Sequence, residues 1–173
     1  LRAWEKGERT AERQQRIRVV AQLVQSQLGS VNAFKTMQSQ GKTVTFSGSE
    51  RELSFFSAIA LVPDHQYGVV FCQLTVESSA GGDSLSLVET LPAAADTVID
   101  ADSIDTTGRV RLLENATSIR FAYLQHASSD EEWRWRSQWL PAENTGMPVA
   151  VNLQIDDPAF EAPLSLLIPL RGR

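Results

Sequence analysis

The chain of 173 residues contains one cysteine, Cys72. A single thiol excludes an internal disulfide, a zinc site built on several cysteines and a paired-cysteine redox motif. Cys72 alternates with Val70, Leu74 and Val76, as residues on the covered face of a strand do. We therefore expect a buried structural thiol, because a nucleophilic cysteine needs a base and an accessible, electropositive setting.

Long apolar runs and local catalytic motifs are also missing. No stretch reaches the roughly 18 apolar residues that a membrane-spanning helix needs, so we expect any membrane anchor to lie upstream of Leu1. The sequence has no GxSxG turn, phosphate-binding glycine loop, HExxH motif or paired-carboxylate pattern. We therefore predict no enzyme, cofactor or metal site, with an active site assembled from distant residues as the alternative.

The chain has a net charge of −5 that is unevenly distributed. Residues 1–35 hold seven Lys or Arg and three Glu, a charge of +4, whereas the remainder carries −9. An acidic body argues against a nucleic-acid partner, because phosphate binding needs clustered Lys and Arg. The basic segment is interpreted as a solvated helix face, with attraction to anionic lipid as the alternative.

An apolar stripe predicts a helix near the N-terminus. Its members recur at intervals of three and four residues, which places them on one side of a helix. They are Ile17, Val20, Ala21, Val24, Leu28 and Val31. Residues 2–16 are almost wholly polar, so we expect this half of the helix to project or to meet another molecule.

The side of the helix opposite the stripe is the predicted partner-binding surface. Its members are Trp4, Ala11, Gln15, Arg18 and Gln22. Trp4 is a large aromatic on an otherwise polar helix, which is typical of an interface anchor. The alternatives place Trp4 near a membrane surface or leave it merely exposed. No capping residue precedes Leu1, so the segment is interpreted as the outer part of a longer helix.

The rest of the chain is predicted to form short strands. Two-residue alternation of apolar side chains indicates sheets with one wet face, and hence antiparallel pairing. The expected strands are residues 44–46, 53–60 with Leu53, Phe55 and Ile59 on one face, 67–77, 84–89, 110–113, 118–125, 149–155 and 164–170. Small residues at 78–83 predict a hairpin connection, and residues 91–108 predict a surface loop. The predicted fold class is α+β, a long N-terminal helix packed on antiparallel β-sheets.

Five segments complete a pattern that resembles a known family. They are residues 44–57 (VTFSGSERELSFFS), 112–124 (LLENATSIRFAYL), the tryptophan block 133–139 and the strands PVAVNLQI at 148–155 and LSLLIPL at 164–170. In this order, after a long helix, they are similar to the J-type minor pseudopilins of bacterial type II secretion (GspJ family).

The resemblance implies a pseudopilin-like fold and a structural function. It implies an N-terminal helix over residues 1–31, whose membrane half is removed, and a β-rich periplasmic head over residues 32–173, in one domain. Such proteins are anchored in the inner membrane by one helix. They assemble with I- and K-type minor pseudopilins, here through the N-terminal helix, into a pseudopilus tip that supports protein export.

Three other groups of residues are weaker candidates. Asp96, Asp100, Asp102 and Asp105 can supply calcium ligands, but they lack EF-hand spacing, so a solvated loop is favoured. His65 and His126 are expected to be exposed or hydrogen-bonded. Trp133, Trp135 and Trp139 are expected to pack across a sheet edge, with a stacking platform for a glycan or peptide as the alternative.

Two binding or assembly classes therefore stand beside the minor pseudopilin, and an unrecognised periplasmic enzyme is a further alternative. One is the minor pilin of a type IV pilus, which would share the helix. The other is a soluble β-rich module that binds a glycan or lipid at residues 133–139.

Overall fold

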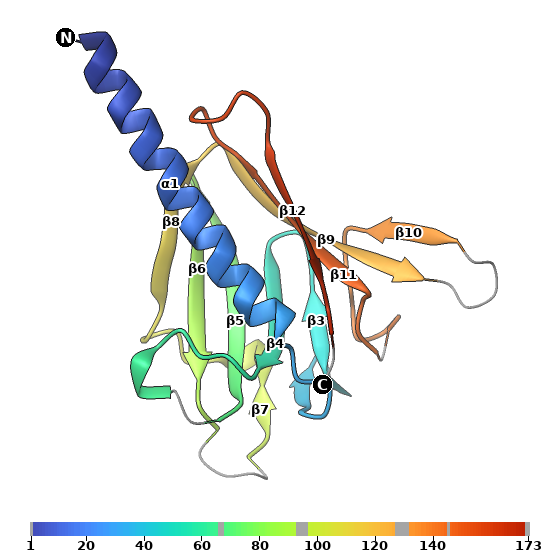
Figure 1. Ribbon diagram of the computed structural model, residues 1–173. Coiled ribbons are helices and arrows are strands. Elements are labelled where there is room, and N and C mark those ends of the chain that lie inside the picture. Colours follow the sequence, from blue (N-terminus) through green and yellow to red (C-terminus); the bar gives the residue numbers. More distant parts are fainter. Residues whose placement is uncertain (1, 66–67, 93–96, 127–131, 145, 172–173) are drawn as a thin grey trace.

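In the computed structural model, one long helix lies across antiparallel β-sheets, an α+β fold (Figure 1). The structure describes residues 2–65, 68–92, 97–126, 132–144 and 146–171. Helix α1 covers Arg2–Gly29, so it ends two residues before the boundary predicted at residue 31. Its first turns stand clear of the sheets, and the rest of the helix lies against β8 (Val110–Ala116) and β12 (Leu164–Pro169).

The strands form two larger sheets and one small sheet. The larger sheets have the orders β3-β4-β5-β6-β8 and β10-β9-β11-β12, and all of their pairs are antiparallel, as expected. The remaining bounds are β3 Phe46–Gly48, β4 Glu52–Ser57, β5 Val70–Ser79, β6 Gly82–Thr90, β9 Ser118–His126, β10 Trp133–Arg136 and β11 Ala150–Asp156.

The small sheet has the order β2-β1-β7. It comprises β1 Met37–Ser39, β2 Lys42–Val44 and β7 Ile99–Asp100. The β1 and β7 strands run parallel, so the expectation of antiparallel pairing throughout is wrong for this pair. Two short 3-10 helices, η1 Pro63–His65 and η2 Ala101–Ser103, complete the elements.

The predicted stripe on α1 is buried. Ile17, Val24 and Leu28 are fully inaccessible and join side chains from both larger sheets in one core. Burying one such side chain contributes about 1.5 to 3 kcal/mol, which explains why this half of the helix is held against the sheets. Val31 is buried beyond the end of the helix, where it pairs with Ser57 in an isolated bridge.

Some strand predictions need correction. The expected strand over residues 53–60 places Ile59 on one face with Leu53 and Phe55, but β4 stops at Ser57, and Ile59 is exposed whereas the other two are buried. Val149 precedes β11 and is likewise exposed. The hairpin between β5 and β6 needs only residues 80–81 as its turn, because the strands continue through most of the small-residue cluster.

The predicted loop at residues 91–108 also contains structure. Ile99 and Ala101 are buried in a second apolar cluster with Phe56 and Phe71, because β7 pairs with β1 there. Two residues are too short a strand to show alternation in a sequence.

Candidate functional site

The N-terminal end of α1 projects beyond the sheets (Figure 1). Residues 2–9 are all exposed, and the Trp4 side chain is 72% accessible. Burial of a tryptophan side chain in an interface contributes favourable free energy. An exposed tryptophan is therefore a candidate contact for a partner.

The predicted partner-binding face is brought together as one strip of the helix surface. Trp4, Ala11, Gln15 and Gln22 are exposed on the side opposite the buried stripe. Arg18 is also exposed, but its guanidinium lies over the ring of Phe160, 5.5 Å from the centroid. Arg18 is therefore held partly by the head and lies at the border of the strip.

Sequence reasoning missed an apolar groove beside this strip. Val19 is 41% exposed and lines the groove with Ala11 and Gln15 from α1 and with Leu112 from β8. Strand β8 is the last strand of its sheet, so the groove runs along a sheet edge. Val19 lies four residues after Gln15, and that spacing is the signal that could have added it to the predicted face.

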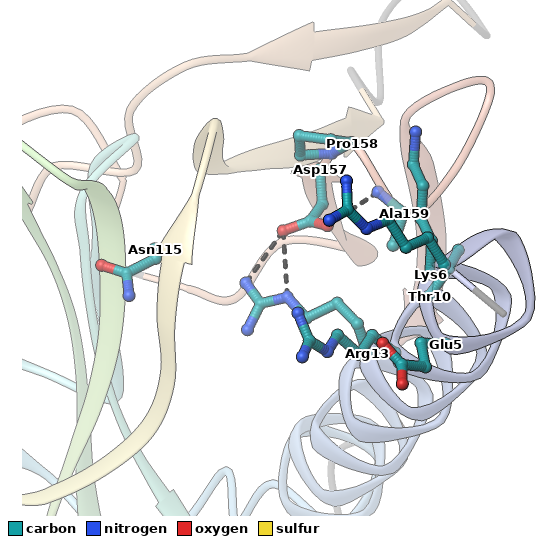
Figure 2. A pocket seen from close by; sticks show the side chains of 10 residues that line it. Glu5, Lys6, Thr10, Arg13, Asn115, Asp157, Pro158 and Ala159 are labelled. Atoms are coloured by element: carbon teal, nitrogen blue, oxygen red, sulfur yellow. Dashed lines mark hydrogen bonds and ion pairs between the residues drawn. The ribbon is translucent and has the colours of Figure 1, made fainter.

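One ion pair anchors the middle of α1 to the head. Arg13 donates from Nε and Nη2 to Oδ2 of Asp157, at 3.2 and 2.8 Å (Figure 2). Its Nη2 also donates to the Glu114 carbonyl at 2.6 Å. The neighbouring Gln14 Nε2 donates to the Ala159 carbonyl at 2.6 Å. The Asp157 side chain is almost fully buried, so this pair is screened less than an exposed one. These contacts fix where the helix leaves the head.

A buried polar cluster anchors the other end of α1. The inaccessible carboxylate of Glu89 accepts hydrogen bonds from Gln27 Nε2 at 2.9 Å and from the backbone N–H groups of Leu61 and Val62. His65 Nδ1 lies 2.9 Å from Glu89 Oε1. The expectation of a hydrogen-bonded His65 is confirmed, and the burial of Gln27 was missed.

The tryptophan block is divided between surface and core. Trp139 is buried and donates from Nε1 to the Gly146 carbonyl at 2.9 Å. Trp133 and Trp135 are about half exposed on β10, so their expected packing across the sheet edge is wrong. Within the described residues, β10 is the edge strand of its sheet and pairs with β9 alone. The exposed His126 ring lies 4.6 Å from the Trp133 ring.

The aspartate loop does not form a cation site in the part of the chain that the structure describes. Asp100 accepts from the Asp102 N–H, Asp102 accepts from the Gln40 N–H, and Asp105 accepts from Thr107. Asp96 lies outside the described residues. Over residues 2–65, 68–92, 97–126, 132–144 and 146–171, no three His, Cys, Asp or Glu side chains form a metal-binding group.

Cys72 is fully buried, as expected. Burial raises the pKa of its thiol well above the usual value, with a further contribution from the nearby Glu89 carboxylate, and a hydrogen bond with Gln27 only partly offsets this. A thiol held protonated in the interior is a poor nucleophile.

Comparison with known proteins leaves the family open. No family model matches the chain, and no curated protein matches it. Among the described residues, no helix is both long and apolar enough to span a bilayer.

Proposed function

We propose that this chain is a J-type minor pseudopilin of a type II secretion system. In this proposal the head lies in the periplasm, an upstream segment anchors the full-length protein in the inner membrane, and the head catalyses no reaction. The observation that carries the proposal is the division of α1. Its second half is buried on antiparallel sheets, while its first half presents Trp4 and a polar strip to solvent.

A helix with one half packed on the head and the other half exposed is suited to a protein that assembles with other subunits. The anchors at Arg13 and Gln27 hold the helix at a set angle to the head, so the exposed strip is presented rigidly. Rigid presentation lowers the entropy cost of association. The partners in this proposal are I- and K-type minor pseudopilins, which would pack against Trp4, Ala11, Gln15 and Gln22 and against the adjoining groove at Val19.

Mixing the chain with the cognate I- and K-type heads tests the proposal. Size-exclusion chromatography should show a complex, and calorimetry should show that Trp4→Ala weakens it by at least about tenfold, as expected for an aromatic anchor. Trp135→Ala is the matched control, because it removes an exposed tryptophan from the far sheet and should leave the affinity unchanged. Absence of a complex, or equal losses in the two variants, would contradict the proposal.

The full-length reading frame separates the protein classes. A short basic leader ending in Gly, a nearby Glu and about 20 apolar residues running into Leu1 are the expected features of a pilin-like protein. A signal peptide with an Ala-x-Ala cleavage site would contradict it. A type IV minor pilin shares the expected features, so the mixing experiment decides between the two.

One observation favours the glycan-binding alternative. Trp133 and Trp135 project from alternate positions of β10, and both are about half exposed on one face of that strand. Under this alternative, soluble glycan fragments should quench tryptophan fluorescence in the unmodified chain and fail to do so in Trp133→Ala/Trp135→Ala. Under the pseudopilin proposal the same double variant still joins the complex.

A further inference from the structure

A cationic cleft separates the first half of α1 from the head (Figure 2). It holds about 680 Å³ between the helix and the loop at residues 157–159, the first part of the connection from β11 to β12. The helix lines it with four basic side chains, Arg2, Lys6, Arg9 and Arg13.

These four residues lie in a straight line along the helix. Their intervals of four, three and four residues continue the direction of the buried stripe that starts at Ile17. The face that is apolar and covered in the second half of α1 is therefore cationic and uncovered in the first half. At 1.5 Å per residue the line is about 16 Å long.

Most of this charge has no partner in the part of the molecule that the structure describes. Arg13 is paired with Asp157, whose other oxygen accepts from the Ala159 N–H at 3.0 Å. Within the described residues, Arg2, Lys6 and Arg9 make no ion pair or hydrogen bond. The acidic side chains that line the cleft are Glu5 and Asp157, so positive charge is in excess there.

We propose that this cleft binds an acidic α-helix of another protein subunit. A helix with Asp or Glu at intervals of four, three and four residues places one carboxylate opposite each base along the line. The aliphatic stems of Lys6 and Arg9, with Pro158 and Ala159 across the cleft, supply apolar surface between the charges. A line about 16 Å long matches three turns of a helix and is far longer than a single phosphate.

A bilayer surface fits this site less well. The cleft is closed on one side by the loop at residues 157–159, which a flat surface cannot enter. Asp156 and Glu161 flank that loop, and anionic lipid would be brought against their carboxylates.

The contact uses the side of α1 opposite Trp4 and goes beyond the proposed pseudopilin contact. The proposed contact depends on the charge of the cleft and does not require that the chain be a pseudopilin.

A labelled model peptide tests the proposal with the full chain of 173 residues. The probe is a capped fluorescent helix of about fifteen alanine-rich residues, the length at which such peptides begin to be helical, with glutamates at the stated intervals. Fluorescence anisotropy should show saturable binding that is lost at about 1 M salt, where the Debye length is about 3 Å. A peptide with glutamine at the same positions should not bind.

Charge reversal in the protein locates the site. Arg9→Glu should weaken binding by about tenfold, and Lys6→Glu/Arg9→Glu should abolish it and gain affinity for a lysine version of the peptide. Arg134→Glu is the control for a single charge reversal, because Arg134 is exposed on the remote strand β10. Trp4→Ala should leave peptide binding intact, which separates this proposal from the pseudopilin interface.

Three results would overturn the inference. They are equal losses in Arg9→Glu and Arg134→Glu, peptide binding that survives Lys6→Glu/Arg9→Glu, and binding of phosphatidylglycerol vesicles without binding of the glutamate peptide. Helicity measured by circular dichroism should be the same for all variants, because the substituted side chains are exposed.

Discussion

Gln27 Nε2 donates a hydrogen bond of 2.9 Å to Glu89 Oε2 across 62 positions of the chain, in a place that water does not reach. The bond ties the last turns of α1 to the end of β6. It explains why the helix keeps one direction relative to the sheets, because an apolar stripe alone permits sliding whereas a buried polar pair specifies one arrangement.

Glu89→Gln is therefore expected to destabilise the fold. The new amide replaces one acceptor oxygen by a donor, which faces either the Leu61 N–H and the Gln27 amide or the Val62 N–H and the His65 ring. A buried donor left without an acceptor costs about 1 to 3 kcal/mol, and urea unfolding followed by circular dichroism would measure it. Glu132→Gln, in an exposed pair with Arg134, should change the free energy of unfolding by less than about 0.5 kcal/mol. Equal effects would show that Glu89 has no special part in stability.

The lowered pKa of Asp83 predicts that the fold loses stability in acid. Burial opposes its ionisation, but hydrogen bonds from Arg51, Ser78 and the Ile119 N–H outweigh burial and lower its pKa from 3.8 to about 2. A carboxylate with a lowered folded-state pKa stabilises the fold above its unfolded pKa, so the contribution is complete above about pH 5 and is lost as the pH falls from about 4 to 2. Because Arg51 is partly exposed and therefore screened, we expect a contribution of about 1 to 2 kcal/mol.

Urea unfolding of Asp83→Asn at several pH values would check this prediction. The variant should be less stable than the unmodified chain at pH 7, and the difference should shrink toward pH 2. Asp64→Asn is the control, because Asp64 is exposed on η1. A difference that does not change with pH would show that the Asp83 charge contributes nothing.

Gly48→Ala is expected to be strongly destabilising. A methyl group at residue 48 would overlap the phenol of Tyr123, whose hydroxyl donates to the Ser49 carbonyl at 2.6 Å. The buried Tyr123 ring cannot move without losing that bond and its contact with Phe46, so we expect a cost of about 2 to 4 kcal/mol. Thermal unfolding would measure it, with Gly108→Ala as the control because open space surrounds that position. Equal melting temperatures for the two variants would refute the argument.

The helix stripe could be predicted from the sequence because Ile17, Val24 and Leu28 repeat with the period of the element they form. Gln27 could not, because a polar residue gives no sign of burial until its partner is known, and Glu89 is distant in the chain. The exposure of Trp135 likewise depends on β10 being an edge strand, which is a property of the sheet order.

The predicted partner-binding face shows the same limit of prediction from sequence. Trp4 and Gln15 were placed correctly by helical geometry alone, since the side opposite a buried stripe is exposed. The groove at Val19 required the position of Leu112 on β8, and the pairing of Arg13 with Asp157 joins residues 144 positions apart. Contacts between distant segments depend on tertiary packing, which local periodicity does not encode.

Val19 and Val20 are adjacent on α1, but shortening their side chains should have different effects on stability. Val20 is 5% exposed within the core, so Val20→Ala should lower the free energy of unfolding by about 1 to 3 kcal/mol through lost apolar contacts. Val19 lines the groove, so Val19→Ala should change stability by less than about 0.5 kcal/mol, because alanine's higher helix propensity offsets the small loss of burial.

For binding under the pseudopilin proposal, the substitution at Val19 should have the larger effect. Val19→Ala should weaken the complex with the I- and K-type heads by about fivefold, since the two γ-methyl groups of valine are lost from a groove that the partner would fill. Folded Val20→Ala should weaken it less, because Val20 also borders the groove but is only 5% exposed there, against 41% for Val19. Calorimetry on both variants, well below their melting temperatures, would measure this. If Val19→Ala binds as tightly as the unmodified chain while Trp4→Ala does not, the interface follows the helix strip and excludes the groove.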